Sequence, residues 1–243
     1  MNISFQSFDL LFVSMSFFLS VFGSYTALSF AIRIPSADKQ SLPFWLITAA
    51  VALGGGAIWS MHFVGMMALN TPIDVSYDLF LTLSSLVMAI IACLAGLYIV
   101  GRSSGEISML ILGGCLTGLG VACMHYLGMA AMIMPAEIEY NTSLVLLSIT
   151  IALIAATTAL WLAFNTRGIL QRAGSSLIMG IAVCGMHYVG MLAVNMKLVD
   201  AVTSTQQPGL FKGDSLAVSI FAISIILMFL LLMIQQFRLK QLS

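Results

Sequence analysis

Met61-His62-Phe63-Val64-Gly65-Met66 is the first of three closely related hexapeptides in this sequence. The others are Met-His-Tyr-Leu-Gly-Met at residues 124–129 and Met-His-Tyr-Val-Gly-Met at residues 186–191. Their histidines are 63 and 62 residues apart, and the chain contains no other histidine. Self-similarity at a fixed period indicates an internal repeat, in which each unit contributes one copy of the same feature.

The segments around the hexapeptides are too apolar for a water-soluble domain. Of 243 residues, 60% are hydrophobic and 7% are charged, whereas soluble domains carry about 25% charged residues. A run of roughly 20 apolar residues forms a helix that spans a bilayer, because backbone groups in lipid must be satisfied within the segment. The sequence predicts an all-α membrane protein with seven spans, at residues 10–32, 43–68, 79–100, 108–134, 142–164, 175–195 and 215–237.

The hexapeptides fall near the ends of the second, fourth and sixth predicted spans. We therefore predict one seven-helix bundle over residues 1–243, built from three two-helix repeats plus a final helix. The repeats cover about residues 9–70, 78–134 and 142–197, and the last helix covers about 215–237. The first span is expected to be a retained helix rather than a removed signal peptide, since no Lys or Arg precedes it.

Basic residues predict how the bundle is oriented. Seven of the nine Lys and Arg fall on one side of the predicted spans: Arg33, Lys39, Arg102, Arg167, Arg172, Arg238 and Lys240. The positive-inside rule makes this side cytoplasmic. The N-terminus is then outside, the C-terminus is cytoplasmic, and the protein is a multi-pass protein of the inner membrane. The zero net charge and the absence of a basic stripe predict no nucleic-acid partner.

The hexapeptides place histidine and methionine at fixed helical positions. At 100° per residue, each histidine and the methionine four residues later lie within about 40° on one face. Three helices could thus bring three imidazoles to one depth and three thioethers one turn further out. The glycine three residues after each histidine is expected to let a neighbouring backbone approach closely. The candidate metal ligands are His62, His125, His187, Met61, Met66, Met124, Met129, Met186 and Met191.

This donor set favours copper. Ionisable residues inside a membrane mark functional sites by default. Imidazole suits several transition metals, whereas thioether selects Cu(I), and no carboxylate or thiolate lies within the hexapeptides. Cys184, three residues before His187, is a further candidate sulfur donor. Two other interpretations stay open: the histidines could be packing residues bonded to backbone carbonyls, or His and Met could be axial ligands of haem.

The triple Met-His-(Phe/Tyr)-x-Gly-Met pattern resembles the MHYT domain, a family of bacterial integral membrane sensor modules. The resemblance covers essentially the whole chain. The chain departs from the family motif at two positions. The family motif has tyrosine where this chain has Phe63, and it has threonine at the fourth position, where this chain has valine or leucine. The resemblance implies one or two copper ions, as Cu(I) or Cu(II), on the motif His and Met residues. It also implies sensing of oxygen, carbon monoxide or nitric oxide, and a cytoplasmic signalling domain or protein as partner.

We therefore expect a sensor in the bacterial inner membrane, with a diatomic gas or copper as its ligand. Its output would be a cytoplasmic module such as one for cyclic-di-GMP turnover. A copper transporter or carrier is an alternative, although Gly55, Gly118 and Gly180 stand where an inward path would need ligands. A membrane copper enzyme is another alternative. No catalytic residue is predicted, because the motif spans offer no general base besides the histidines.

Overall fold

The computed structural model describes residues 2–3, 8–69, 75–103, 105–198 and 211–242. Seven helical spans of these residues are long and apolar enough to cross a membrane, as predicted. The second span is continuous but contains a π-helix, so it divides into α2 (Leu42–Ala50), η1 (Val51–Trp59) and α3 (Ser60–Met67). The others are α1 (Leu10–Ala31), α4 (Leu79–Arg102), α5 (Ile107–Ala130), α6 (Thr142–Asn165), α7 (Gly168–Leu192) and α8 (Gly213–Leu242).

Three boundaries differ from the predicted spans by four residues or more. One is the end of α8, at Leu242 rather than at residue 237. Helix α7 begins at Gly168, which has a φ of 79°, rather than at residue 175. Its first turns carry Gln171 and Arg172. These polar residues lie outside any apolar run, so the prediction left them out, but the end of a helix at the membrane surface tolerates them. Helix α5 ends at Ala130 rather than at residue 134, because the next residues form a strand.

Six spans form a closed ring in chain order, so that α7 packs against α1. Within this ring, α3 also contacts α5 and α7, which brings the three motif-bearing spans together at the centre. Helix α8 lies outside the ring, against α1, η1 and α3. The first span is therefore an integral part of the bundle.

The two helices of each repeat are joined at their ends in the same way. The N-cap residue of the odd span donates its backbone N–H to the carbonyl of the alanine that caps the even span. The three bonds are Asp9 to Ala68 at 2.7 Å, Asp78 to Ala131 at 2.8 Å and Asn141 to Ala193 at 2.8 Å. Each N-cap side chain also accepts a hydrogen bond from the first turn of its helix, which satisfies a backbone donor that would otherwise be unpaired.

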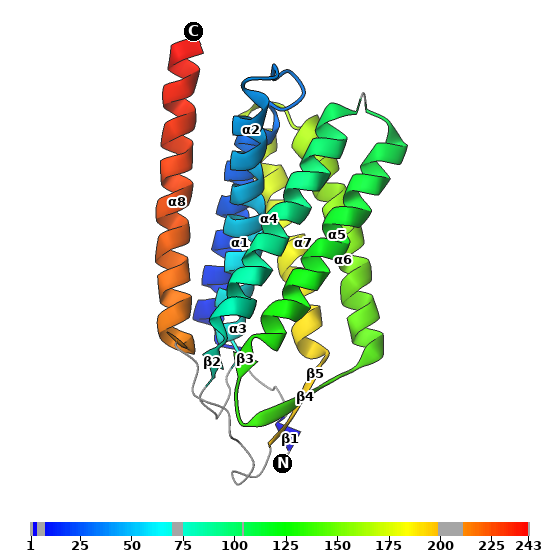
Figure 1. The fold of residues 1–243 in the computed structure, drawn as a ribbon, viewed down its shortest axis with the longest axis vertical. Coiled ribbons are helices and arrows are strands. Elements are labelled where there is room, and N and C mark those ends of the chain that lie inside the picture. The colour runs from blue at the N-terminus through cyan, green and yellow to red at the C-terminus, as the bar shows by residue number, and fades with distance from the viewer. Residues whose placement is uncertain (1, 4–7, 70–74, 104, 199–210, 243) are drawn as a thin grey trace.

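Short strands that the sequence analysis did not predict gather near the motif end of the bundle (Figure 1). One antiparallel sheet has the order β1 (Asn2–Ile3), β5 (Val194–Leu198) and β4 (Ala136–Tyr140). The other has the order β3 (Met132–Ile133), β2 (Ser76–Tyr77) and β6 (Phe211–Lys212). They pair the N-terminal residues with segments that precede or follow the membrane-spanning helices. The fold class is still all-α.

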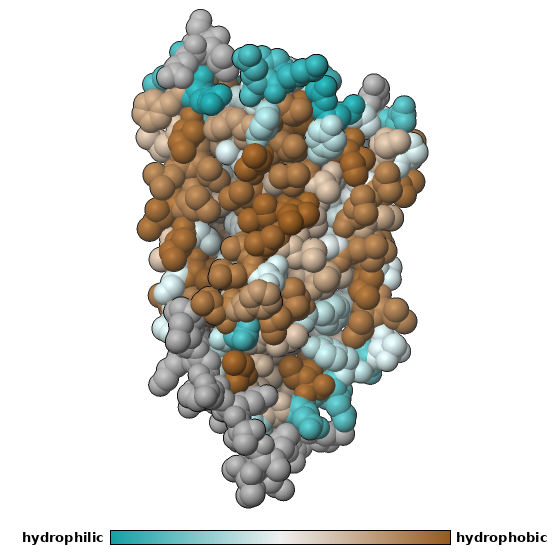
Figure 2. Space-filling model, in the orientation of Figure 1, coloured by the Kyte–Doolittle hydropathy of each residue, from teal (hydrophilic) through white to brown (hydrophobic). Residues whose placement is uncertain are grey.

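The surface carries an apolar belt between two polar ends (Figure 2). Large apolar side chains such as Phe80, at 76% exposed, and Ile107, at 72%, have no protein partner that would cover them and face lipid. The seven basic residues on one side of the predicted spans lie at the end of the bundle that holds the C-terminus, because successive helices alternate in direction. Which end faces the cytoplasm stays a prediction.

Candidate metal centre

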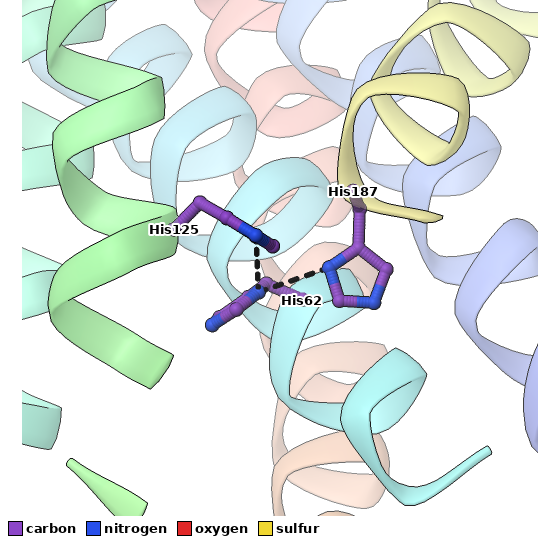
Figure 3. A group of neighbouring side chains, drawn as sticks. All are labelled: His62, His125 and His187. Carbon is purple, nitrogen blue, oxygen red and sulfur yellow. Dashed lines mark hydrogen bonds between the residues drawn. The ribbon is translucent and has the colours of Figure 1, made fainter. Parts of the chain in front are cut away.

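The three histidines converge at the centre of the bundle. His62 of α3, His125 of α5 and His187 of α7 point toward one another (Figure 3). The Nδ1 atom of His62 lies 3.0 Å from Nδ1 of His187 and 3.2 Å from Nδ1 of His125. One ring nitrogen from each histidine lies within 4.8 Å of the other two. All three side chains are buried, with 1% or less exposed.

Hydrogen bonding alone satisfies this arrangement poorly. In a neutral imidazole, each nitrogen carries either one proton or one lone pair, directed in the plane of the ring. The Nδ1 atom of His62 takes part in both contacts, so it can direct its single proton or lone pair at one partner only. Three lone pairs that face one point are, in contrast, the arrangement that binds a cation.

The other ring nitrogens lie against glycines of the next repeat. The Nε2 atoms of His62, His125 and His187 are buried and have no well-aligned hydrogen-bond partner among the described residues. His62 faces Gly128, His125 faces Gly190 and His187 faces Gly65. A Cβ atom added to any of these glycines would lie less than 3.0 Å from the histidine ring, a distance that real Cβ atoms essentially never show. The motif glycine thus makes room for a histidine ring, not for a neighbouring backbone as expected. The carbonyl of Gly65 is also close to His187.

The spacing of the Nδ1 atoms fits one metal ion. With metal–imidazole bonds of about 2.0–2.1 Å, three nitrogens around an ion lie roughly 3.3–3.6 Å apart. The observed 3.0 and 3.2 Å are a few tenths of an ångström shorter. The separations of His62 Nδ1 from its two partners are thus close to those that one ion would require.

The methionines of the motif stand next to the histidine or one turn after it, and all six are buried, with 3% or less exposed. Met186, which directly precedes His187, lines an apolar cavity. Ligation by any methionine sulfur stays a prediction. Cys184 is not part of the cluster of candidate ligand atoms found among the described residues.

Aromatic residues of the motifs fix the even helices to the next repeat. The phenol of Tyr126 lies 2.6 Å from the hydroxyl of Ser148, and the phenol of Tyr188 lies 2.9 Å from that of Ser16. In the first motif Phe63 has no hydroxyl. There Trp59, one turn earlier, donates its Nε1–H to Ser85 at 3.0 Å.

The three serines are equivalent positions that the sequence analysis missed. Each follows the N-cap residue of its odd span by seven positions: Ser16 after Asp9, Ser85 after Asp78 and Ser148 after Asn141. Each donates its hydroxyl to the carbonyl three residues earlier, so it accepts from the aromatic partner. The sequence signal that could have revealed these serines is an Asp or Asn followed by Ser seven residues later. The aromatic–serine and histidine–glycine contacts both run from each repeat to the next, and from the third to the first.

Comparison with known proteins identifies the same three repeats. Residues 55–113, 118–175 and 180–242 each match the MHYT repeat, described as "Bacterial signalling protein N terminal repeat". The chain belongs to the MHYT family. Each matched repeat begins at a glycine seven residues before a motif histidine. No solved structure matches the chain.

Three curated relatives show the context of this domain. The chain is 44% identical over 198 residues to the bifunctional diguanylate cyclase/cyclic di-GMP phosphodiesterase MucR of Pseudomonas aeruginosa, a match that covers 79% of this chain and 29% of MucR. It is 37% identical to the cyclic di-GMP phosphodiesterase NbdA of the same organism, covering 75% of this chain and 24% of NbdA. It is 32% identical to the signaling protein YkoW of Bacillus subtilis, covering 74% of this chain and 23% of YkoW.

The chain therefore spans less than a third of the length of these relatives. It is the sensor domain of seven membrane helices, and the enzymatic output domains of the relatives are not covered by it. Its seven apolar helices and its membership of a bacterial signalling family make it a multi-pass protein of the bacterial inner membrane.

Proposed function

We propose that this domain binds copper through the Nδ1 atoms of His62, His125 and His187. We further propose that it senses a diatomic gas, or copper itself, and signals to a cytoplasmic module of cyclic-di-GMP turnover. The observation that supports the proposal is the convergence of three buried Nδ1 atoms, with His62 at 3.0 and 3.2 Å from its two partners. Neutral imidazoles add no charge, so a monovalent ion would leave a site of about +1, less costly in a buried position than a divalent ion.

The chain's own residues prepare this site. Gly65, Gly128 and Gly190 seat the ring edges that carry Nε2, which leaves Nδ1 directed at the centre. The aromatic–serine bonds hold each motif helix against the next repeat. Burial of all three rings excludes bulk water. Copper held there would supply a soft centre with positions open to a further ligand such as a diatomic gas.

Contacts of α8 offer a route from the site to the opposite end of the bundle. Met228 of α8 fills the space beside Gly56 of η1, directly before the first motif. Further along α8, Gln235 donates to the carbonyl of Ser29 at 2.5 Å, and the Arg238 guanidinium lies 4.1 Å over the ring of Phe44. A ligand that favours one packing of α3 over another would thereby also shift α8. The π-helix before α3 supports such a shift, because π-helical turns often mark functional sites.

Transport of copper is less well supported. An ion path across the membrane needs polar or sulfur ligands at successive depths. One turn inward of the histidines stand Ile58, Val121 and Val183, which offer no ligand atom. The histidine site is therefore better explained as a binding site that retains its ion than as one step of a transport path.

The copper content of the purified protein tests the proposal. The full chain would be purified in detergent, reconstituted with Cu(I), washed and measured by elemental analysis, beside an absorption spectrum for haem. We expect one or two copper ions per chain and no haem bands. The variant in which all three histidines are replaced by Gln should lose the copper, because Gln offers no imidazole nitrogen.

Two controls make this result interpretable. Monodisperse elution of the triple variant would show that it still folds. If it does not, the single variant His125→Gln replaces it. A second variant, Met66→Leu/Met129→Leu/Met191→Leu, keeps the side-chain volume and tests the thioethers. Absence of copper from the reconstituted parent, or retention of copper by a folded histidine variant, would overturn the proposed site.

A further inference from the structure

An apolar cavity of about 30 Å³ lies directly inward of the histidine cluster. Ile58, Val121 and Val183 in its wall each precede a motif histidine by four residues, which is about one helical turn. Met186, also in the wall, is the residue next to His187. The cavity and the histidines therefore occupy adjacent levels of the same central space.

The cavity has no polar group that would hold water. A buried water needs about two to four polar partners. Thr117 is the one hydroxyl-bearing residue of the lining, and it donates its hydroxyl to the carbonyl of Ala92 at 3.2 Å. The remaining lining residues are aliphatic or methionine. Cavities of this kind stay dry and take up apolar molecules or xenon.

Helix α6 provides the space and brings it toward the surface. Its contribution to the lining is four alanines, at 152, 155, 156 and 159, and one leucine, Leu160. Ala155 and Ala159 are half-buried, and the nearby Ile154 is 63% exposed on the belt that faces lipid. The cavity thus reaches the lipid-facing side of the bundle between α6 and its neighbours.

We propose that this cavity is a binding site for a small apolar molecule of the size of a diatomic gas, taken up from the lipid. A volume of about 30 Å³ holds a molecule of about two heavy atoms, since one water needs roughly 10–15 Å³ on the same measure. The membrane core favours apolar solutes, so the route past Ala155 and Ala159 bypasses both aqueous surfaces. Occupancy of the cavity does not depend on a metal. Its role as a supply of ligand to the histidines rests on the proposed function.

Xenon tests the occupancy without any metal. Protein labelled with ¹³C at the methionine methyls, prepared without copper, would be titrated with xenon pressure and followed by NMR. We expect saturable shifts of the Met179 and Met186 methyls, which line the cavity. The methyls of Met61, Met124 and Met129 are equally buried but lie outside the lining, so they should stay unshifted. Equal shifts at all five, or none at Met179 and Met186, would overturn the site.

A pair of variants on α6 sharpens the test. Ala155→Leu adds three carbons at the edge of the cavity and should abolish the shifts at Met179 and Met186. Thr158→Leu places a side chain of the same size on the exposed face of the same helix, and the shifts should persist. Undiminished shifts in a folded Ala155→Leu variant would contradict the assigned opening.

The link to the histidines needs a separate measurement. In copper-loaded protein, Ala155→Leu should slow carbon monoxide association without changing copper content, whereas Thr158→Leu should leave the rate unchanged. Protein that binds xenon but takes up no copper on reconstitution with Cu(I) would leave the cavity intact and overturn the proposed function alone. Saturable xenon binding with an unchanged carbon monoxide rate in Ala155→Leu would overturn the role of the cavity as the supply route.

Discussion

The first motif and the other two perform the same structural task with different side chains. In the second and third motifs a tyrosine phenol reaches the serine of the next repeat, at 2.6 Å for Tyr126 and 2.9 Å for Tyr188. In the first motif the tyrosine position holds Phe63, and the indole of Trp59 reaches Ser85 at 3.0 Å instead. The two rings pack together, with centroids 4.9 Å apart.

This difference shows what the aromatic position does in this chain. A hydrogen bond to the serine is made in all three places, whereas the phenol is present in two. The replacement comes from one turn earlier on the helix, where a side chain faces the same neighbour. The function of the aromatic residue is therefore to hold the motif helix against the next repeat, and not to supply a phenol to the candidate metal centre.

The largest effect is expected where the three motifs are alike. Gly190→Ala would place a Cβ against the ring of His125, closer than the 3.0 Å that such atoms keep. The ring would have to move from the cluster, and overpacking of this kind costs about 1–3 kcal/mol. Thermal unfolding in detergent should show a lower midpoint, and the variant should lose copper.

Gly185→Ala is the matched control, because it lies on the same helix and a Cβ there has no neighbour within 4 Å. Alanine is favoured over glycine in a helix by roughly 0.5–1 kcal/mol, so this variant should be as stable as the parent or more stable. Equal behaviour of the two variants would show that the histidine ring is not seated on Gly190.

An intermediate effect is expected from removal of the tryptophan. Trp59→Phe keeps an aromatic ring but leaves Ser85 without its donor, at a cost of about 0.5–1.5 kcal/mol. Tyr188→Phe should cost a similar amount, because it removes the equivalent bond to Ser16. The control is Trp161→Phe on α6, where the indole is 50% exposed. Loss of stability at Trp161 as large as at Trp59 would show that the bond to Ser85 contributes nothing.

The smallest effect, and the sharpest test, is a rescue. Phe63→Tyr in the Trp59→Phe background gives the first motif the same donor as the other two. We expect it to restore part of the lost unfolding free energy, about 0.5–1 kcal/mol, while Phe63→Tyr alone changes little because Ser85 already has its donor. The same unfolding assay measures it. A double variant no more stable than Trp59→Phe would mean that the first motif is not equivalent to the others.

The sequence by itself determined the seven spans and the placement of the histidines. The thickness of a bilayer sets the length of an apolar helix, and the repeat of 62 or 63 residues puts each histidine at the same level of an even span. Helix length and repeat period can both be found by counting residues along the chain. The apolar criterion failed at the start of α7 and the end of α5, where polar helix ends and short strands leave the bilayer core.

Only the tertiary structure decided which atoms meet. Nδ1 rather than Nε2 faces the centre because each ring edge is seated on a glycine of the next repeat, 62 or more residues away in the chain. Trp59 substitutes for a missing phenol because η1 and α4 place it opposite Ser85. The cavity exists because α6 contributes four small alanine side chains at the level of the bundle next to the histidines. These contacts depend on the packing of three repeats into a closed ring, which helical periodicity along one segment does not specify.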